Sequence, residues 1–385
     1  MNKKYFVILP LLFLMVIGCN KNNIPSDVTF SPNEMESTEI HTDMQLNVFI
    51  NNLDAVILDT TYNYLAPYED QLIRQVDLSR PNPIHFSWEA AIKGGSVDTY
   101  KLTISENEDL SNPLIYRTRV NEIDVYNLKT ATTYYWTVSA YKFTSEIQQF
   151  NTSNTMIRNL YVDGVRNVRD VGGVAYSKIK QGMIYRGGAF EKFNRTYKKV
   201  ETNITKDGIR AIQFLGIKTE VDLRRNDEDK ENCELTKSTV NGLNYINLPM
   251  QFHNENILTY KNGPYGNYDN PARIKEFFEL LAKENSYPIY MHCSQGKDRT
   301  GCLAYLVESL LGATQDELYA DYLFSSLSGS DNKVNVSGIT TTYGTTLKNY
   351  GTAEMTLAEK VYAYLNEVVG ISTQNLDAVK RLLSK

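Results

Sequence analysis

The residues best suited to chemistry lie between Tyr290 and Gly312, in the stretch YMHCSQGKDRTGCLAYLVESLLG. Cys293 and Arg299 are separated by five residues there, and Thr300 and Gly301 follow directly. A short apolar run precedes the stretch, and a helix beginning near Thr300 is predicted to follow it, an arrangement that binds anions at the helix N-terminus. Converging N–H groups at such a site lower a cysteine pKa from about 8.5 to between about 3.5 and 7.5. Cys293 is therefore predicted to be a thiolate nucleophile at neutral pH.

The loop after this cysteine has the composition of a phosphate-binding site. Backbone N–H groups from Ser294 through Arg299 can line a concave nest, and Gly296 relieves the strain of the turn. Arg299 can grip a phosphoryl group with its planar, bidentate guanidinium, which lysine cannot do. The competing interpretation, a loop with a buried structural cysteine, leaves His292, Lys297 and Asp298 unexplained. The predicted substrate-binding residues are Ser294, Gln295, Gly296, Lys297, Thr300 and Gly301.

The run HCSQGKDRTG resembles the signature loop of the cysteine-dependent tyrosine phosphatases. Its Gly-Lys-Asp-Arg-Thr-Gly version resembles the bacterial secreted branch, which has tyrosine and phosphoinositide phosphatase activity. Further segments match landmarks of the same branch in order: Asn167, Arg169, Asp170, Gly172 and Gly173; Tyr185 and Arg186; then Asp222, Leu223 and Arg224. The resemblance implies an α/β phosphatase domain over residues 160–385, with a central sheet flanked by helices.

The resemblance implies hydrolysis of phosphomonoesters in two in-line steps through a phosphocysteine on Cys293. Charge spread over the phosphoryl oxygens in a loose transition state would be stabilised by the loop N–H groups and by Arg299. His292 is expected either to orient the loop and favour the thiolate or to make a structural hydrogen bond. Thr300 is expected to donate to the sulfur, to cap the helix, or to do both.

The proton donor to the leaving group is open among three aspartates. No Trp-Pro-Asp sequence, which supplies the acid in many tyrosine phosphatases, occurs in the chain. In the branch that the chain resembles, the aspartate inside the loop is favoured, which corresponds to Asp298. Asp170, beside two glycines, can instead stabilise a turn, and Asp222, at a strand end, can instead fix Arg224.

Lys297 adds a second cation to the loop, which suits a substrate with more than one phosphate, although it can also simply offset Asp298. The expected substrate is a phosphorylated protein (phosphotyrosine, with phosphoserine or phosphothreonine as extensions) or a phosphoinositide. The alternatives are a phosphoinositide or inositol-phosphate phosphatase with little protein activity, and an inactive surface binding protein. No His/Asp cluster has ligand spacing, so neither a metal nor another cofactor is expected.

Length and composition predict a globular, multidomain chain. The 385 residues are 42% hydrophobic and 22% charged, which suffices for ordinary cores. The net charge of −5 gives no general attraction to nucleic acid, so no nucleic-acid partner is expected.

The N-terminus resembles a lipoprotein signal. Lys3 and Lys4 precede an apolar run that ends Val-Ile-Gly-Cys, with Cys19 as the predicted lipidation site and residues 1–18 as the cleaved peptide. The alternative is a short uncleaved anchor helix. We expect membrane attachment through the lipid and an extracytoplasmic bacterial lipoprotein, in the periplasm or at the cell surface, with the outer membrane favoured because Asn20 follows Cys19. Cys233, Cys293 and Cys302 then form an odd set of thiols, which argues against a disulfide framework.

An all-β domain is predicted between the N-terminal tether (19–43) and the phosphatase domain. Over residues 77–152, apolar residues alternate in segments such as HFSWEA, TYKLTIS and TTYYWTVSA, separated by turn-forming stretches. Leu128, Tyr134 and Trp136 resemble the corner and penultimate strand of a fibronectin type III sandwich, with Trp88 as the expected core aromatic. Residues 44–76 remain unassigned, with the β domain as one option. A carbohydrate or protein ligand of the sandwich is conceivable, but no residue pattern supports one.

The Tyr-, Asn- and Gly-rich segment from Gln251 to Pro271 lies between a strand and a helix. Its composition fits either a movable lid over the site or a simple surface connection.

Overall fold

The computed structural model describes residues 24–35, 37–48, 52–58, 65–74, 76–194, 199–225, 237–252, 257–263, 266–329, 334, 339 and 344–385. The chain forms two compact units. The first contains the chain up to Ile40 together with Asn82–Thr155, and the second contains His41–Pro81 and Met156–Lys385. The predicted signal peptide and Cys19 lie outside the described residues. Among the described helices, none has the length and apolar character needed to cross a bilayer.

The first unit consists of two antiparallel sheets. One contains β1 (Asp27–Pro32), β2 (Ile84–Lys93) and β5 (Glu122–Val125). The other contains β4 (Leu114–Thr118), β3 (Tyr100–Ser105), β6 (Thr133–Ala140), β7 (Phe143–Thr144) and β8 (Gln148–Asn151). The Phe86 ring of β2 meets the Trp136 ring of β6 edge to face at 5.1 Å, and Trp88 is fully buried. The sheets therefore share one aromatic core, and the Tyr134 hydroxyl fixes the turn before β6 by accepting a bond from the Lys129 N–H (2.9 Å).

The tether predicted over residues 19–43 is wrong for Asp27–Pro32, which forms the edge strand β1. This strand pairs with β2 from Asp27–Lys93 to Pro32–Trp88. Its last residue is a proline, which an edge position tolerates because one side of the strand needs no ladder bond. Pairing with a distant segment, rather than a strong local pattern, makes this stretch a strand.

Residues 44–76 group with the second unit. The Gln45 side chain donates to the carbonyls of Leu78 and Arg80, while Val56 and Leu72 join the main hydrophobic cluster of that unit. The described elements here are α1 (Asp43–Leu46), α2 (Leu53–Leu58), η3 (Ala66–Tyr68) and α3 (Glu69–Ile73).

The second unit is built around a six-stranded sheet in the order β15-β14-β18-β11-β10-β9. The four strands β15, β14, β18 and β11 are parallel, and β10 and β9 continue antiparallel. The strands are β9 (Arg158–Asn159), β10 (Arg169–Asp170), β11 (Ile184–Gly187), β14 (Thr219–Asp222), β15 (Asn244–Asn247) and β18 (Ile289–His292). Two hairpins lie outside this sheet: β12 (Glu191–Asn194) with β13 (Lys199–Thr202), and β16 (Lys261–Gly263) with β17 (Gly266–Asp269).

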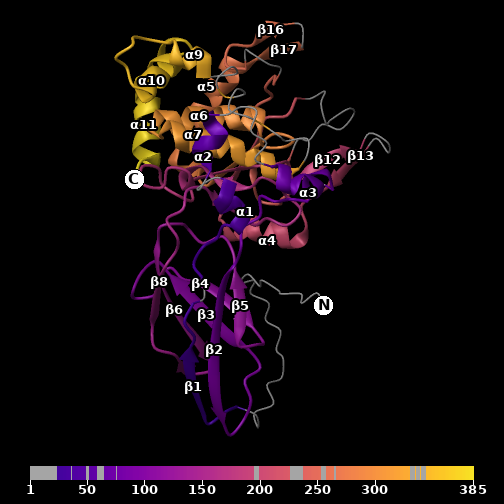
Figure 1. Cartoon of the computed structure of the whole chain (residues 1–385), viewed down its shortest axis with the longest axis vertical. Helices are drawn as coiled ribbons and strands as arrows, with labels where there is room; N and C mark the ends of the chain where they lie inside the picture. The colour runs from indigo at the N-terminus through magenta and orange to yellow at the C-terminus, as the bar shows by residue number, and fades with distance from the viewer. Residues whose placement is uncertain are drawn as a thin grey trace. The chain divides into compact units, whose positions relative to one another are not determined.

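Helices surround this sheet in the second unit (Figure 1). Helix α10 (Leu357–Glu367) packs against α6 (Asp298–Leu310), and α11 (Thr373–Leu383) packs against α5 (Asn270–Leu281). Their bounds, with those of the shorter turns, are η4 (Val171–Gly173), α4 (Lys206–Phe214), α5 (Asn270–Leu281), η5 (Glu284–Ser286), α6 (Asp298–Leu310), α7 (Gln315–Phe324), η6 (Ser325–Ser328), α9 (Thr345–Lys348), α10 (Leu357–Glu367) and α11 (Thr373–Leu383). These elements agree with the tyrosine-phosphatase-like domain of sheet and helices expected from the sequence.

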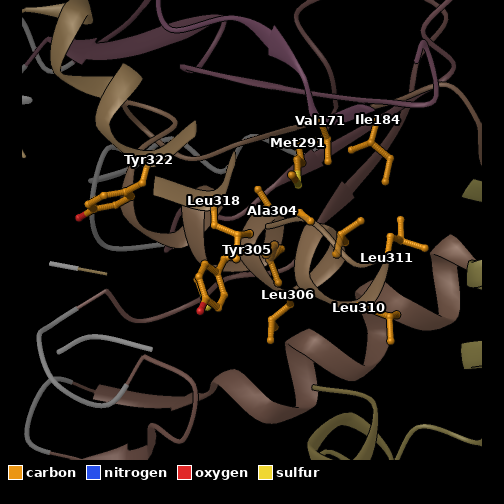
Figure 2. Packing of buried hydrophobic residues seen from close by; sticks show 14 of the residues in the cluster. Val171, Ile184, Met291, Ala304, Tyr305, Leu306, Leu310, Leu311, Leu318 and Tyr322 are labelled. Atoms are coloured by element: carbon orange, nitrogen blue, oxygen red, sulfur yellow. The ribbon is translucent and has the colours of Figure 1, made fainter. Parts of the chain in front are cut away.

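Helix α6 is the buried centre of the second unit. Every residue from Arg299 to Leu310 is buried, although the sequence predicts a helix with one apolar face. Met291 of β18 and Ile184 of β11 belong to the same hydrophobic cluster as Ala304 and Leu306 of α6 (Figure 2). Packing on all sides fixes the helix, and with it the loop from which the helix starts.

The predicted lid, Gln251–Pro271, lies partly outside the described residues. Its described part contains the β16–β17 hairpin and an anchor at its end, where the Asn270 side chain donates to the carbonyls of Gln251 and Ile257. Whether this segment is a movable lid or a simple surface connection therefore stays a prediction.

Candidate active site

The loop with the predicted nucleophile lies between β18 and α6. The strands β14, β18 and β11 run parallel and end in register at Asp222, His292 and Gly187. Ligands of α/β sheets bind at this carboxyl edge, where loops leave the strands and helices begin. The sequence places the helix start near Thr300, whereas α6 begins at Asp298, with the Gly301 N–H bonded to the Lys297 carbonyl at 2.8 Å.

Three carbonyl groups of the loop are held by three donors from other segments. Those of Ser294, Gln295 and Gly296 accept from the Ala189 N–H (3.2 Å), the Asn167 side-chain amide (3.1 Å) and the Arg186 guanidinium (2.8 Å), respectively. The C=O and N–H of a trans peptide unit point in opposite directions, so the N–H groups of these units face away from the anchors. Within the described part of the chain, the N–H groups of Gln295, Gly296 and Lys297 have no acceptor. They are donors available to an anion.

Gly296 makes this loop shape possible. Its φ is +72°, in the left-handed region, and a Cβ built on it would lie 2.2 Å from the Gly187 carbonyl oxygen. Both the backbone angle and the close approach of β11 exclude a larger residue.

The electrostatics of Cys293 favour the thiolate. The residue is buried and unpaired with another cysteine, and burial alone would raise its pKa. The Arg299 charge and the Thr300 hydroxyl and N–H outweigh this effect, so that the pKa lies below its ordinary value even though Asp298 opposes them.

Arg299 is oriented by backbone carbonyls and an aromatic ring. Its Nη1 donates to the Leu223 carbonyl (3.2 Å) and approaches the Met250 carbonyl (3.5 Å). The guanidinium lies 5.0 Å from the centre of the Phe252 ring, and Arg225 stands 5.2 Å from the same ring. The loops after β14 and β15 thus hold Arg299 in place, and they bring a second guanidinium to this side of the site.

His292 is buried against two carboxylates. Its Nε2 lies 2.9 Å from Glu220 Oε1, its Nδ1 lies 4.0 Å from Asp222 Oδ1, and Nδ1 is 3.2 Å from the Cys293 carbonyl oxygen. Burial lowers the imidazole pKa, but Asp222 and Glu220 together raise it above its usual value. The ring is stabilised as a cation directly before the nucleophile, a geometry compatible with both roles expected for it.

The three candidate acids differ in exposure and partners. The Asp298 side chain is 40% exposed, stands in the first turn of α6, and lies 3.9 Å from Lys297 Nζ. Asp222 is fully buried and accepts from the Arg224 guanidinium (2.8 Å) and the Tyr245 hydroxyl (2.7 Å). Asp170 is also fully buried and bonds to Arg158 (2.6 Å) and to the N–H groups of Gly172 and Gly182. Arg224 in turn is paired with both Asp222 and Glu191.

A buried charge cluster supports the loop from the side of β10, β11 and α7. Asp321 of α7 pairs with Arg186 and with Arg169 Nε (2.5 Å), and Arg169 also bonds to the Asn167 side chain (2.6 Å). Arg186 and Asn167 are the donors that hold the loop carbonyls, so this cluster fixes their positions. Glu308 lies beside it, and burial raises the pKa of its carboxyl well above the usual range.

Several of these residues could not be identified from their local sequence. Glu220, Asp321 and Glu308 sit in apolar elements with no motif around them, while Phe252 and Arg225 flank recognised segments. For Glu220, Asp321 and Glu308, the available signal was the acidic side chain itself, placed in a short strand or helix that is buried. A buried carboxylate requires a partner, so such a residue indicates a buried ion pair or hydrogen bond. Within the described ranges, no group of three His, Cys, Asp or Glu side chains is arranged to hold a metal ion.

Comparison with known proteins identifies the family. Residues 160–385 match the tyrosine phosphatase family. A Cupriavidus necator protein assigned as a tyrosine-protein phosphatase is 25% identical over 185 residues, covering 44% of this chain and 63% of that protein. A tyrosine-protein phosphatase of Nostoc commune is 26% identical over 126 residues, covering 30% of this chain and 42% of its own length. The chain thus spans less than two thirds of either relative.

Among solved structures, Pseudomonas aeruginosa TpbA matches with 15% identity and a TM-score of 0.30, covering 49% of this chain and 89% of TpbA. The core catalytic domain of the PP-IP phosphatase SIW14 from S. cerevisiae matches with 19% identity and a TM-score of 0.24, covering 37% of this chain and 71% of that domain. The family match extends over more than half of the chain and includes the loop, the strands β10, β11, β14, β15 and β18 of the sheet, and the terminal helices described above. This chain belongs to the tyrosine phosphatase family.

Proposed function

We propose that the chain hydrolyses phosphomonoesters, phosphotyrosine foremost, through a phosphocysteine intermediate. The Cys293 thiolate attacks phosphorus and the ester oxygen leaves with a proton from an acid. Water then attacks the phosphocysteine, releasing inorganic phosphate and restoring the thiolate. No metal enters either step, because Arg299 and the loop N–H groups can supply the positive charge that the phosphoryl oxygens need.

One observation carries this proposal above the others. Successive loop carbonyls are bonded to donors behind the loop, which leaves the N–H groups of Gln295, Gly296 and Lys297 without protein acceptors among the described residues. A loop with a merely structural cysteine does not require three successive N–H donors to be held ready in this way. Together with a thiol of lowered pKa and a guanidinium that is already oriented, they provide a site for a tetrahedral oxyanion.

Asp298 is the proposed proton donor. A general acid must reach the leaving oxygen and exchange its proton with water, which the partly exposed Asp298 can do. Asp222 and Asp170 are sealed from solvent, and each carries an arginine partner and two or more hydrogen bonds. Their proposed role is to fix Arg224 and the η4 turn, respectively.

A leaving-group series on Asp298→Asn, Asp170→Asn and Asp222→Asn tests this assignment. Loss of the acid should reduce kcat for a poor leaving group such as a phenol of high pKa by about 10²- to 10⁴-fold, and should affect a good leaving group such as p-nitrophenol far less. Asp170→Asn and Asp222→Asn should lower kcat for both leaving groups alike. If Asp298→Asn shows no dependence on the leaving group, the acid is another residue.

For the natural substrate, phosphotyrosine and phosphoinositides are the two candidates. The resemblance of the loop to that of the bacterial secreted branch and the position of Lys297 favour activity on both, while the 3.9 Å approach of Lys297 to Asp298 also fits simple charge compensation. Turnover of a phosphotyrosine peptide compared with that of a soluble phosphoinositide distinguishes a protein phosphatase from a phosphoinositide or inositol-phosphate phosphatase. An inactive surface binding protein would turn over neither.

The location is proposed from the N-terminal sequence. The lipobox-like Val-Ile-Gly-Cys run supports an exported lipoprotein anchored through Cys19, and the β unit is proposed to be a fibronectin type III-like spacer or recognition module. Expression of the full chain with Cys19→Ser should release it from the membrane fraction. Retention of that variant in the membrane would contradict the lipid anchor.

A further inference from the structure

Two guanidinium groups share one aromatic ring at the edge of the active site. The Phe252 ring centre lies 5.0 Å from the guanidinium of Arg299 and 5.2 Å from that of Arg225. Arg225 also lies 5.8 Å from the Tyr268 ring centre. A cation is attracted to an aromatic ring, but two cations repel each other. Both guanidinium groups therefore stay near the Phe252 ring only where further contacts fix the ring and Arg225.

Gln251 supplies contacts to both. Its side-chain oxygen accepts from the Phe252 N–H and from Arg225 Nη1, each at 2.9 Å. The Gln251 side chain is fully buried. Both neighbours are donors, so the oxygen of the amide and not its NH₂ group faces them, and that oxygen has one lone pair for each. One buried acceptor thus fixes the backbone that carries the ring and the cation beside the ring.

Gln251 is itself fixed by the start of α5. Its N–H donates to Asn270 Oδ1 and its carbonyl accepts from Asn270 Nδ2, both at 2.8 Å. Asn270 is fully buried, donates also to the Ile257 carbonyl (2.7 Å), and directly follows the last residue of β17. A continuous series of contacts therefore leads from the β17–α5 junction through Gln251 and the Phe252 ring to Arg299.

We propose that Gln251 positions the catalytic Arg299 through the Phe252 ring, without touching the substrate. The proposal rests on the proposed phosphatase function and deepens it, because it names the residue that orients the cation of that site. Neither the loop motif nor the family landmarks in the sequence include Gln251. Gln251 is the first residue of the Tyr-, Asn- and Gly-rich segment, so the contacts give that segment a part in catalysis that requires no motion.

The orientation of Arg299 matters because its planar fork must meet two oxygens. The Leu223 and Met250 carbonyls both approach Nη1 of Arg299, and the contact with the ring adds a constraint on the tilt of the guanidinium plane. A guanidinium binds two phosphoryl oxygens best when they lie in its plane. The oxygens move as phosphorus passes through the in-line transition state, so a tilted plane weakens binding of that state more than binding of a resting phosphate.

Kinetics of p-nitrophenyl phosphate hydrolysis test the proposal in two pairs of variants. Gln251→Leu removes the acceptor and Phe252→Leu removes the ring, so each should lower kcat/KM by about 10- to 10²-fold. Gln251→Glu keeps two acceptor lone pairs beside Arg225, and Phe252→Tyr keeps a ring, so these two variants should recover most of the loss. The control Gln213→Leu removes an exposed amide on α4 and should leave kcat/KM unchanged.

Inhibition constants separate the orientation of Arg299 from a general loss of folded protein. Orthovanadate adopts the five-coordinate geometry of the transition state, whereas orthophosphate stays tetrahedral. Gln251→Leu and Phe252→Leu should raise the inhibition constant of orthovanadate about tenfold relative to that of orthophosphate. A smaller folded fraction lowers the measured rate but leaves this ratio unchanged.

Three results would overturn the positioning role. The first is a kcat/KM in both leucine variants no lower than that of Gln213→Leu. The second is an impairment of Gln251→Glu and Phe252→Tyr equal to that of the leucine variants, because the acceptor and the ring would then not matter. The third is an equal change of the two inhibition constants, since Arg299 would then act as a point charge.

Two further measures keep the test decisive. Phe252 is only half-buried, so Phe252→Leu tests the ring even if Gln251→Leu fails to fold. Calorimetry of orthovanadate binding to wild type and to Phe252→Leu needs no turnover. A wild type that hydrolyses no phosphomonoester would reject the proposed function, whereas an orthovanadate affinity unchanged in Phe252→Leu would reject the positioning role.

Discussion

Two buried cysteines lie nine residues apart, on either side of the start of α6, and their environments act in opposite directions. Cys302 lies in the helix among apolar side chains, and burial raises the pKa of its thiol far above the usual range. Cys293 is almost as buried, yet its pKa is lowered, because Arg299 and Thr300 outweigh the loss of water. Removal from solvent is thus common to both residues. Fixed positive charge and hydrogen-bond donors determine which of the two can be an anion.

The largest expected effect comes from exchanging the sulfur at each position. Cys293→Ser should lower kcat by at least about 10⁴-fold, because a serine hydroxyl is not ionised by the same donors. Cys302→Ser should keep most of the activity and lower the free energy of unfolding by about 1–3 kcal/mol, since it buries a hydroxyl in an apolar site. Steady-state kinetics and urea unfolding measure the two effects.

The contrast would break if both variants lost activity without loss of stability, since Cys302 would then take part in the reaction. It would also break if Cys293→Ser stayed active, because another group would then be the nucleophile.

Next in size is the effect of the cation that distinguishes the two sites. Arg299→Lys should reduce kcat/KM by about 10²- to 10³-fold, because a lysine keeps the charge but cannot bind two phosphoryl oxygens in one plane. The same variant should leave the Cys293 pKa low, whereas Arg299→Gln should raise it. The pH dependence of Cys293 alkylation by iodoacetamide measures the pKa of the thiol, and so separates the effect of the Arg299 charge from that of its planar geometry. A rise of the pKa in Arg299→Lys equal to that in Arg299→Gln would contradict this separation.

The sequence predicts the residues that act on Cys293 better than the residues that hold its loop in place. The loop residues that bear on Cys293 lie within eight positions of it, so their spacing alone indicates an anion site. The groups that hold the loop come from elsewhere: Asn167 and Arg186 bond its carbonyls, and Asp321 positions Arg186 from 135 residues away. Such partners depend on sheet register and helix packing, which no local pattern encodes. Asn167 and Arg186 were recognised only as family landmarks, and Asp321 not at all.

The β unit illustrates the same limit. The alternation in HFSWEA and TTYYWTVSA predicts strands that the structure contains as β2 and β6. Asp27–Pro32 carries only a weak pattern, and it becomes a strand because β2 offers an open edge for pairing. Residues 44–76 likewise have short apolar runs whose partners lie in the second unit, so their assignment required the fold.

A smaller effect is expected from the Thr300 hydroxyl, which helps to lower the pKa of Cys293. Thr300→Val removes the hydroxyl that favours the thiolate, so the pKa of Cys293 should rise by about one unit, as one bond to a charged group is worth about 1.5–3 kcal/mol before relaxation. The alkylation profile should shift to higher pH, while Thr300→Ser should retain the wild-type profile. Cys302 should remain unmodified in the folded protein throughout. An unchanged profile in Thr300→Val would leave Arg299 as the main cause of the shift.

The smallest effect concerns His292, the residue directly before Cys293. Glu220 and Asp222 raise its pKa above the unfolded value of about 6.5. The stability linked to this proton is therefore fully present below about pH 6.5 and is lost as the pH rises through the higher folded value. Glu220→Gln should lower the folded pKa, so the variant should lose less stability than wild type over the same rise in pH. NMR titration of the imidazole and urea unfolding at several pH values measure both quantities, and an unchanged His292 pKa in Glu220→Gln would show that Asp222 alone holds the proton. In that case the cation beside Cys293 would depend on the Asp222–Arg224 pair, and Arg224→Gln, which removes the competing cation, should raise the His292 pKa.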